Sequence, residues 1–126
     1  MLARRIFPLL LLLFSTMTLA RVGEPFDQKT FDRLNSDARS ILVAVHADWC
    51  TTCKAQVQVL STLVQRPGFK SLSLLRIDFD CQKEPLSAFR VIERSTLIVF
   101  RSGKEVGRLT GATSALVIEA LLQKAF

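Results

Sequence analysis

Residues 49–54 read WCTTCK and come shortly after the apolar run ILVAV at 41–45. The run predicts a buried strand, and the residues after Cys53 predict a helix. A strand that leads into two cysteines spaced three apart, at the start of a helix, is typical of a reversible dithiol and disulfide pair. There Cys50 would lie at the positive end of the helix dipole, which favours its thiolate, and Cys53 would lie one turn inside. The stretch predicts a redox centre in which one sulfur attacks and the other resolves.

Two other uses of such a cysteine pair fit the rest of the chain less well. A structural zinc site needs four ligands, and beyond the pair the chain offers only Cys81 and His46. A purely structural disulfide would close a very short loop and would remove little entropy from the unfolded chain. We therefore predict a redox pair with no metal and no cofactor. We expect Cys81 to be a small buried side chain, with a reactive or intermolecular thiol as alternatives.

The first twenty residues carry the pattern of a secretory signal peptide. Arg4 and Arg5 form a positive segment, residues 6–14 are apolar, and residues 18–20 end in a small residue that suits signal peptidase. We therefore predict a signal peptide at 1–20 and a single domain at 21–126. The alternative is an uncleaved anchor in the inner membrane, although the apolar stretch is short for a membrane span.

The charge of the chain indicates ordinary solubilising side chains. The formal net charge is +6 over 126 residues, a length that gives room for one domain. Lysines and arginines are scattered along the domain and form no basic run. We therefore expect no nucleic-acid partner.

The remaining hydrophobic pattern alternates helices with strands. It predicts helices at 24–37, 50–65, 83–89 and 112–125, and strands at 41–45, 72–79, 96–100 and 104–109. This alternation predicts parallel strands, and Ser102-Gly103 predicts a hairpin turn that adds an antiparallel edge. We expect an α/β domain with a central mixed sheet of about four strands, flanked by helices on both faces. In the last helix we expect the inward side chains to be Leu116, Val117, Ala120 and Leu121.

Several fragments, in this order, resemble the thioredoxin family. They are ADWCTTCK at 47–54, IDFD at 77–80, STLIVF at 95–100, GKEVG at 103–107 and Gly111 before the last helix. The resemblance covers nearly all of the chain after residue 20 and implies the thioredoxin fold. It also implies that Cys50 is the attacking thiol, that Cys53 is the resolving thiol, and that Trp49 helps to shape the surface that meets the substrate.

The chain departs from the family where thioredoxins usually have a cis-proline facing the disulfide. That residue is Ser95 here. A cis bond before a non-proline residue costs about 2.5–4 kcal/mol, so we expect a trans Arg94–Ser95 bond and a loop that is differently shaped or more mobile. We expect this loop to face the cysteine pair and to bind substrate through Arg94, Ser95 and Thr96, offering backbone groups to an extended substrate strand.

A second departure concerns proton transfer. Thioredoxins carry a buried acid near the resolving cysteine, and the corresponding residue here is Ala44. The usual proton acceptor is therefore absent. Four other side chains are candidates to replace it, and the sequence does not choose among them: His46, Asp48, Asp78 and Asp80.

The resemblance and the predicted export together indicate a periplasmic thiol–disulfide oxidoreductase. Thr51 and Thr52 place no charge between the cysteines, so we expect a pair that reduces or exchanges protein disulfides rather than a strong oxidant. Because the periplasm has no reducing buffer of its own, we expect a membrane-embedded electron donor. We also expect a monomer. The alternatives are a metal-binding protein and a non-catalytic thioredoxin-fold binding module.

Overall fold

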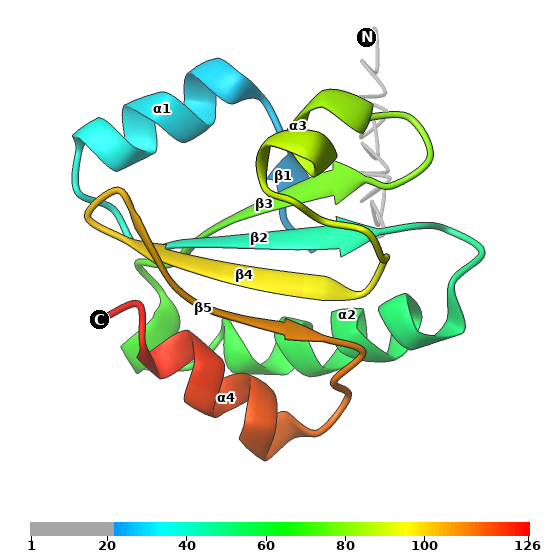
Figure 1. Ribbon diagram of the computed structural model, residues 1–126. Helices are drawn as coiled ribbons and strands as arrows, with labels where there is room; N and C mark the ends of the chain where they lie inside the picture. The colour runs from blue at the N-terminus through cyan, green and yellow to red at the C-terminus, as the bar shows by residue number, and fades with distance from the viewer. Residues whose placement is uncertain (1–21) are drawn as a thin grey trace, which may run out of the picture.

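The computed structural model describes residues 22–126, and the predicted signal peptide at 1–20 lies outside the described residues. The centre of the domain is a mixed sheet of five strands in the order β1-β3-β2-β4-β5 (Figure 1). The strands are β1 (Glu24–Pro25), β2 (Ile41–His46), β3 (Ser73–Asp78), β4 (Thr96–Arg101) and β5 (Lys104–Thr110). β3 runs parallel to both β1 and β2, whereas β4 is antiparallel to β2 and to β5.

The predicted α/β architecture is confirmed, with five strands where the sequence predicted about four. The added strand, β1, pairs with Leu75 and Arg76 of β3. It has only two residues and so leaves no periodicity in the sequence. The first helix, α1 (Gln28–Ser36), begins later than predicted because Asp27 caps it, with its carboxylate accepting from the Thr30 amide at 3.1 Å.

β4 runs antiparallel to β2, so the prediction of a parallel strand here is wrong. The preceding helix, α3 (Lys83–Ala88), has six residues and is about 9 Å long. A six-residue strand such as β3 spans about 20 Å, so α3 does not carry the chain back along the sheet. β4 therefore starts at the edge where β3 ends. There the amide of Ser95 donates to the carbonyl of Val45 in β2 at 2.9 Å.

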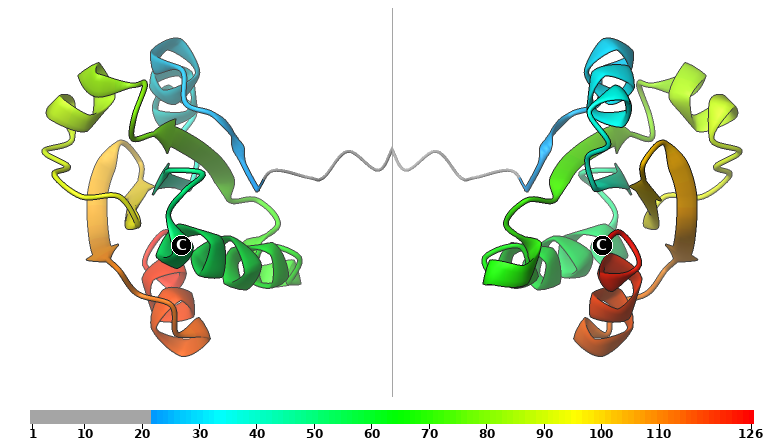
Figure 2. Two further views of the ribbon diagram at one scale, coloured as in Figure 1. Left: turned by 90° about the vertical axis from the view of Figure 1, so that its right-hand side faces the viewer. Right: turned by 90° about the vertical axis from the view of Figure 1, so that its left-hand side faces the viewer.

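Helices cover both faces of the sheet, as predicted. α1 and α3 lie on one face, and α2 (Thr51–Leu63) and α4 (Ala115–Gln123) lie on the other (Figures 1 and 2). Successive β2 side chains enter opposite clusters, with Val43 and Val45 on the α1 side and Leu42 on the α2 side. Because β2 is buried on both faces, its sequence is a continuous apolar run.

Of the four side chains predicted to face inward from α4, Leu121 is buried, whereas the prediction is wrong for Leu116, Val117 and Ala120, which are exposed. The buried residues of α4 are Ile118, Leu121 and Leu122, whereas Leu116 is 79% exposed and Val117 is 45% exposed. The helix is apolar on nearly every side, so its spacing fits more than one inward face. Packing against the sheet selects among them.

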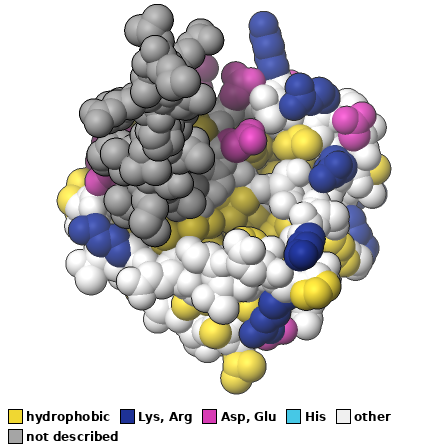
Figure 3. Space-filling model, turned by 180° about the vertical axis from the view of Figure 1, so that it is seen from behind, with side chains coloured by type: hydrophobic (Ala, Val, Ile, Leu, Met, Phe, Trp, Pro, Cys, Tyr) yellow, Lys and Arg dark blue, Asp and Glu magenta, His cyan; other side chains and the backbone are white. Residues whose placement is uncertain are grey.

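The surface of the described domain carries dispersed charge. On the face in Figure 3, Lys and Arg side chains are spread out and interspersed with Asp and Glu. Across residues 22–126, each helix is too short or too polar to cross a bilayer.

Candidate active site

The turn between β2 and α2 carries the cysteine pair. Cys50 is the N-cap of α2, and its Sγ accepts a hydrogen bond from the Cys53 amide at 3.1 Å. The first amides of a helix have no partner within the helix and form the positive end of its dipole. The Cys50 sulfur therefore lies where a thiolate is stabilised, as the sequence predicted.

Cys50 and Cys53 form a disulfide with a Cα–Cα distance of 5.2 Å. Cys50 is 3% exposed and Cys53 is 1% exposed, so both sulfurs are shielded in the oxidised form. The assignment of Cys50 as attacker and Cys53 as resolver stays a prediction.

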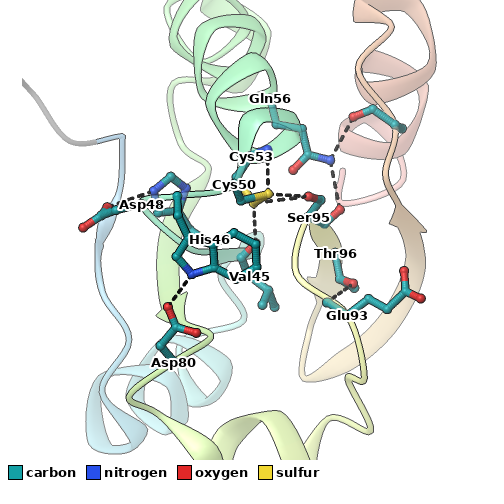
Figure 4. The surroundings of a disulfide bond; sticks show 12 residues. Val45, His46, Asp48, Cys50, Cys53, Gln56, Asp80, Glu93, Ser95 and Thr96 are labelled. Carbon is teal, nitrogen blue, oxygen red and sulfur yellow. Dashed lines mark hydrogen bonds and ion pairs between the residues drawn. A yellow bond between two sulfur atoms is a disulfide. The ribbon is translucent and has the colours of Figure 1, made fainter.

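Ser95 lies against this disulfide, as the sequence predicted. Its Oγ is 3.2 Å from the Sγ of Cys50 and 3.2 Å from that of Cys53 (Figure 4). None of the peptide bonds among residues 22–126 is cis, which confirms the expected trans Arg94–Ser95 bond. Ser95 instead adopts a positive φ of 63°, and this turns its side chain toward the sulfurs without a proline.

The backbone of Ser95 is fixed by the rest of the domain. Its amide donates to Val45 at 2.9 Å, and its carbonyl accepts from the Gly111 amide at 3.0 Å and from Gln56 Nε2 at 2.9 Å. Three hydrogen bonds thus anchor the backbone of Ser95 to β2, α2 and the segment after β5. Its own amide and carbonyl already have partners, so a substrate strand would have to use the backbone of a neighbour such as Arg94.

Gln56 is the site residue that the sequence reasoning missed. It is 3% exposed, and its amide nitrogen donates to the carbonyls of Ser95 and Ala112, the latter at 2.8 Å. It therefore joins α2 to the loops before β4 and before α4. The sequence did contain a sign of this role, because Gln56 is a polar residue on the inward face of α2, between Cys53 and Leu60.

Trp49 and Arg94 form one exposed surface beside the disulfide. Trp49 is 58% exposed, and its indole nitrogen donates to Asp80 at 2.8 Å. The Arg94 guanidinium carbon lies 4.3 Å from the centre of the Trp49 ring, in a cation–π contact. The two predicted substrate residues are thus brought together, and Arg94 is held over an aromatic face.

Thr96, the third predicted residue of the substrate loop, forms its side-chain hydrogen bonds with residues just before β4 and in β5, and not with the sulfurs. It is 3% exposed, and its hydroxyl donates to the Glu93 carbonyl at 2.8 Å and lies 3.2 Å from the hydroxyl of Thr110. In Figure 4 its side chain points away from the disulfide, toward Glu93. Thr96 fixes the start of β4 and contributes no free polar group to the sulfurs.

The four candidate proton acceptors have separate surroundings. His46 Nε2 lies 3.2 Å from a carboxylate oxygen of Asp48, and Asp80 binds Trp49. Asp78 accepts from the amides of Asp80 and Cys81 at 2.9 and 3.0 Å and so holds the turn after β3. No hydrogen bond within residues 22–126 joins any of the four to a sulfur of the pair. Of the four, His46 is the one that lines the same small cavity as Cys53, together with Ala44 and Gln56.

Cys81 is exposed, so the expectation of a buried side chain is wrong. It lies in the turn after β3, where its amide is bound by Asp78 and its side chain is left in solvent. The negative charge of Asp78 raises the pKa of the Cys81 thiol above its ordinary value. The charge near Cys81 therefore disfavours a thiolate, whereas the helix N-terminus at Cys50 favours one. Within the described part of the chain, no three His, Cys, Asp or Glu side chains are grouped to hold a metal ion.

The fold and the disulfide at the start of α2 define a thiol–disulfide oxidoreductase, and known proteins give its family. The thioredoxin family model matches residues 22–124. The thioredoxin of Chlamydia muridarum is 33% identical over 84 residues, which are 67% of this chain and 80% of that protein. The thioredoxin of Mycolicibacterium smegmatis is 34% identical over 95 residues, which are 74% of this chain and 83% of that protein.

Solved structures agree with this assignment. Trxlp from Edwardsiella tarda matches with a TM-score of 0.78 at 38% identity, covering 79% of this chain and 97% of that chain. A thioredoxin variant from Halobacterium salinarum matches with a TM-score of 0.71 at 25% identity, covering 82% of this chain and 88% of that chain. The present chain belongs to the thioredoxin family, as its sequence fragments predicted.

Proposed function

We propose that this thioredoxin-family protein is exported to the periplasm, where it reduces or exchanges disulfides of protein substrates as a monomer. The observation that carries the proposal is the position of Cys50 as the N-cap of α2, with Trp49 and Arg94 exposed beside it. A sulfur at a helix N-terminus is the form of cysteine that attacks a disulfide. The exposed indole and guanidinium give an extended protein segment a surface to bind.

The direction of electron flow is argued from what lies between the cysteines. Thr51 and Thr52 bring no positive charge to the sulfurs. A dithiol pair is a strong oxidant when its reduced form is strongly stabilised. Here the reduced form is stabilised only by the helix N-terminus, so the reduction potential of the pair should be closer to about −270 mV than to about −120 mV. A pair with this potential in the periplasm needs a supply of electrons, and we propose a membrane-embedded donor.

An insulin-reduction assay tests the activity. The purified protein with dithiothreitol should accelerate insulin precipitation, and the Cys50→Ser variant should not. A protein that binds insulin without reducing it would instead be a thioredoxin-fold binding module. The potential is measured separately, by equilibrating the pair with thiol buffers of known potential. A value near −120 mV would contradict the proposed reducing role.

Export is tested by expressing the full chain in a Gram-negative host. The proposal predicts a protein that begins at Arg21 and is released with the periplasmic extract, because Ala20 suits cleavage. N-terminal sequencing of the purified protein gives the result. A chain that begins at Met1 in the membrane fraction would support an anchored form and would overturn the proposed release.

A further inference from the structure

The Ser95 hydroxyl lies between the two reacting sulfurs. Its Oγ is 3.2 Å from each Sγ, and Ser95 is only 4% exposed. Within residues 22–126, these two sulfurs are the only hydrogen-bond partners of that hydroxyl. A hydroxyl can donate one hydrogen bond and accept others at the same time. Ser95 can therefore accept from the thiol of one cysteine while it donates to the thiolate of the other.

The backbone of Ser95 holds the hydroxyl in this position. A φ of 63° is unfavourable for a residue with a Cβ, and glycine would adopt it without penalty. Hydrogen bonds to Val45, Gly111 and Gln56 nevertheless keep Ser95 in that conformation. Residues held in such conformations cluster at functional sites. A glycine would adopt this φ more easily, but it would lack the hydroxyl that contacts the disulfide.

No other polar side chain of the described domain competes for the sulfurs. Charged or titratable groups surround the pair from the end of β2, from α2, from the turn after β3 and from the loop before β4. These groups are His46, Asp48, Lys54, Asp80 and Arg94. Each of them has another partner or is exposed to solvent, and none forms a hydrogen bond with either sulfur. The sulfurs are contacted instead by the Cys53 amide and the Ser95 hydroxyl, and the Cys53 Sγ also lies 3.9 Å from the carbonyl oxygen of Val45.

We propose that the Ser95 hydroxyl is a catalytic hydrogen-bond donor that stabilises first the Cys50 thiolate and then the Cys53 thiolate. This inference deepens the proposed function and rests on it. In the dithiol form, the Cys53 thiol donates to Ser95 Oγ, and the Ser95 hydroxyl donates to the Cys50 thiolate. When Cys50 has been consumed, the same hydroxyl turns to Cys53.

The reaction then balances without a covalent bond to serine. The Cys50 thiolate attacks a substrate disulfide, forms a mixed disulfide and releases one substrate thiolate, which takes a proton from solvent. Cys53 then loses its proton to solvent and attacks the Cys50 sulfur as a thiolate. The Cys50–Cys53 disulfide forms, the mixed disulfide breaks, and a second substrate thiolate leaves. Two electrons pass from the dithiol to the substrate.

The test measures thiolate formation in the reduced protein by its absorbance at 240 nm as a function of pH. The full chain is used with Cys81→Ser throughout, so that only the pair contributes. Ser95→Ala removes the hydroxyl and keeps the Cβ, whereas Ser95→Gly also relieves the unfavourable φ. Ser61→Ala is the control, because it removes a hydroxyl of α2 that donates to the Val57 carbonyl at 2.6 Å.

The proposal predicts that the pKa of Cys50 rises by about one unit in both Ser95 variants and stays unchanged in Ser61→Ala. One unit is a tenfold change and is at the low end for a hydrogen bond to a charged group. Mixed disulfides should also resolve about tenfold more slowly in both Ser95 variants, since the Cys53 thiolate loses the same donor.

Two results would overturn the proposal. One is a Cys50 pKa in both Ser95 variants that equals the parent value. The other is a shift in Ser95→Ala that is absent in Ser95→Gly, because the backbone would then be the cause. The titration needs no substrate, so it remains decisive if the parent protein fails to reduce insulin. That failure would count against the proposed function alone.

Discussion

Replacing Gln56 by leucine should destabilise the domain by removing the link between α2 and the two loops at the site. The side chains have similar size, so the main loss is the pair of hydrogen bonds to the carbonyls of Ser95 and Ala112, at 2.9 and 2.8 Å. Each such bond contributes about 1 kcal/mol net. The Ser95 carbonyl keeps the Gly111 amide as a partner, whereas the Ala112 carbonyl loses the one side-chain donor that it has within residues 22–126.

The expected loss in the free energy of unfolding is therefore about 2 kcal/mol. Urea unfolding followed by far-UV circular dichroism measures it, because a single domain of this size should unfold in one transition. With a urea dependence of about 1–2 kcal/mol per molar, the midpoint should fall by about 1 M or more.

Gln58→Leu is the matched control. Gln58 lies on the same helix and is exposed, so its substitution should change the free energy of unfolding by less than about 0.5 kcal/mol. Equal losses in the two variants, or no loss in Gln56→Leu, would refute the reasoning that the buried amide holds the loops.

Three further changes probe other parts of the domain. Asp78→Asn should speed alkylation of Cys81 near neutral pH, because removing the negative charge lowers the raised thiol pKa and increases the thiolate fraction; an unchanged rate would contradict this cause. Ser95→Pro should lower the free energy of unfolding by more than about 1 kcal/mol, because proline fixes φ near −65° and lacks the bonded amide; a neutral effect in urea unfolding would contradict it. Leu116→Ala should cost less than about 0.5 kcal/mol and Ile118→Ala about 2–5 kcal/mol; the reverse order in thermal unfolding would show that α4 packs by its other face.

The sequence predicted the redox pair well because its signals are local. An apolar strand, two cysteines spaced three apart and a following helix determine that Cys50 caps α2. The resemblance added that Ser95 would face the pair, although 42 residues separate it from Cys53. Neither the local sequence pattern nor the family resemblance predicted the positive φ at Ser95 or the role of Gln56. These two features depend on contacts between segments that are distant in the chain.

Other features were not predictable because the local pattern was ambiguous or too short. A two-residue strand such as β1 carries no period, and only pairing with β3 defines it. The last helix is apolar nearly all round, so spacing alone did not select Ile118 over Leu116. Cys81 was expected to be buried because cysteine usually is. The turn after β3, held by Asp78, leaves it in solvent.

Trapping of mixed disulfides tests most directly the central claim that Cys50 attacks and Cys53 resolves. The full chain with Cys81→Ser is prepared with either Cys53→Ser or Cys50→Ser and incubated with a disulfide-containing protein such as insulin. The account predicts reductant-sensitive adducts on a non-reducing gel for Cys53→Ser and none for Cys50→Ser, since only Cys50 lies at the helix N-terminus with its sulfur at the first amides. Adducts formed by Cys50→Ser and absent from Cys53→Ser would contradict it.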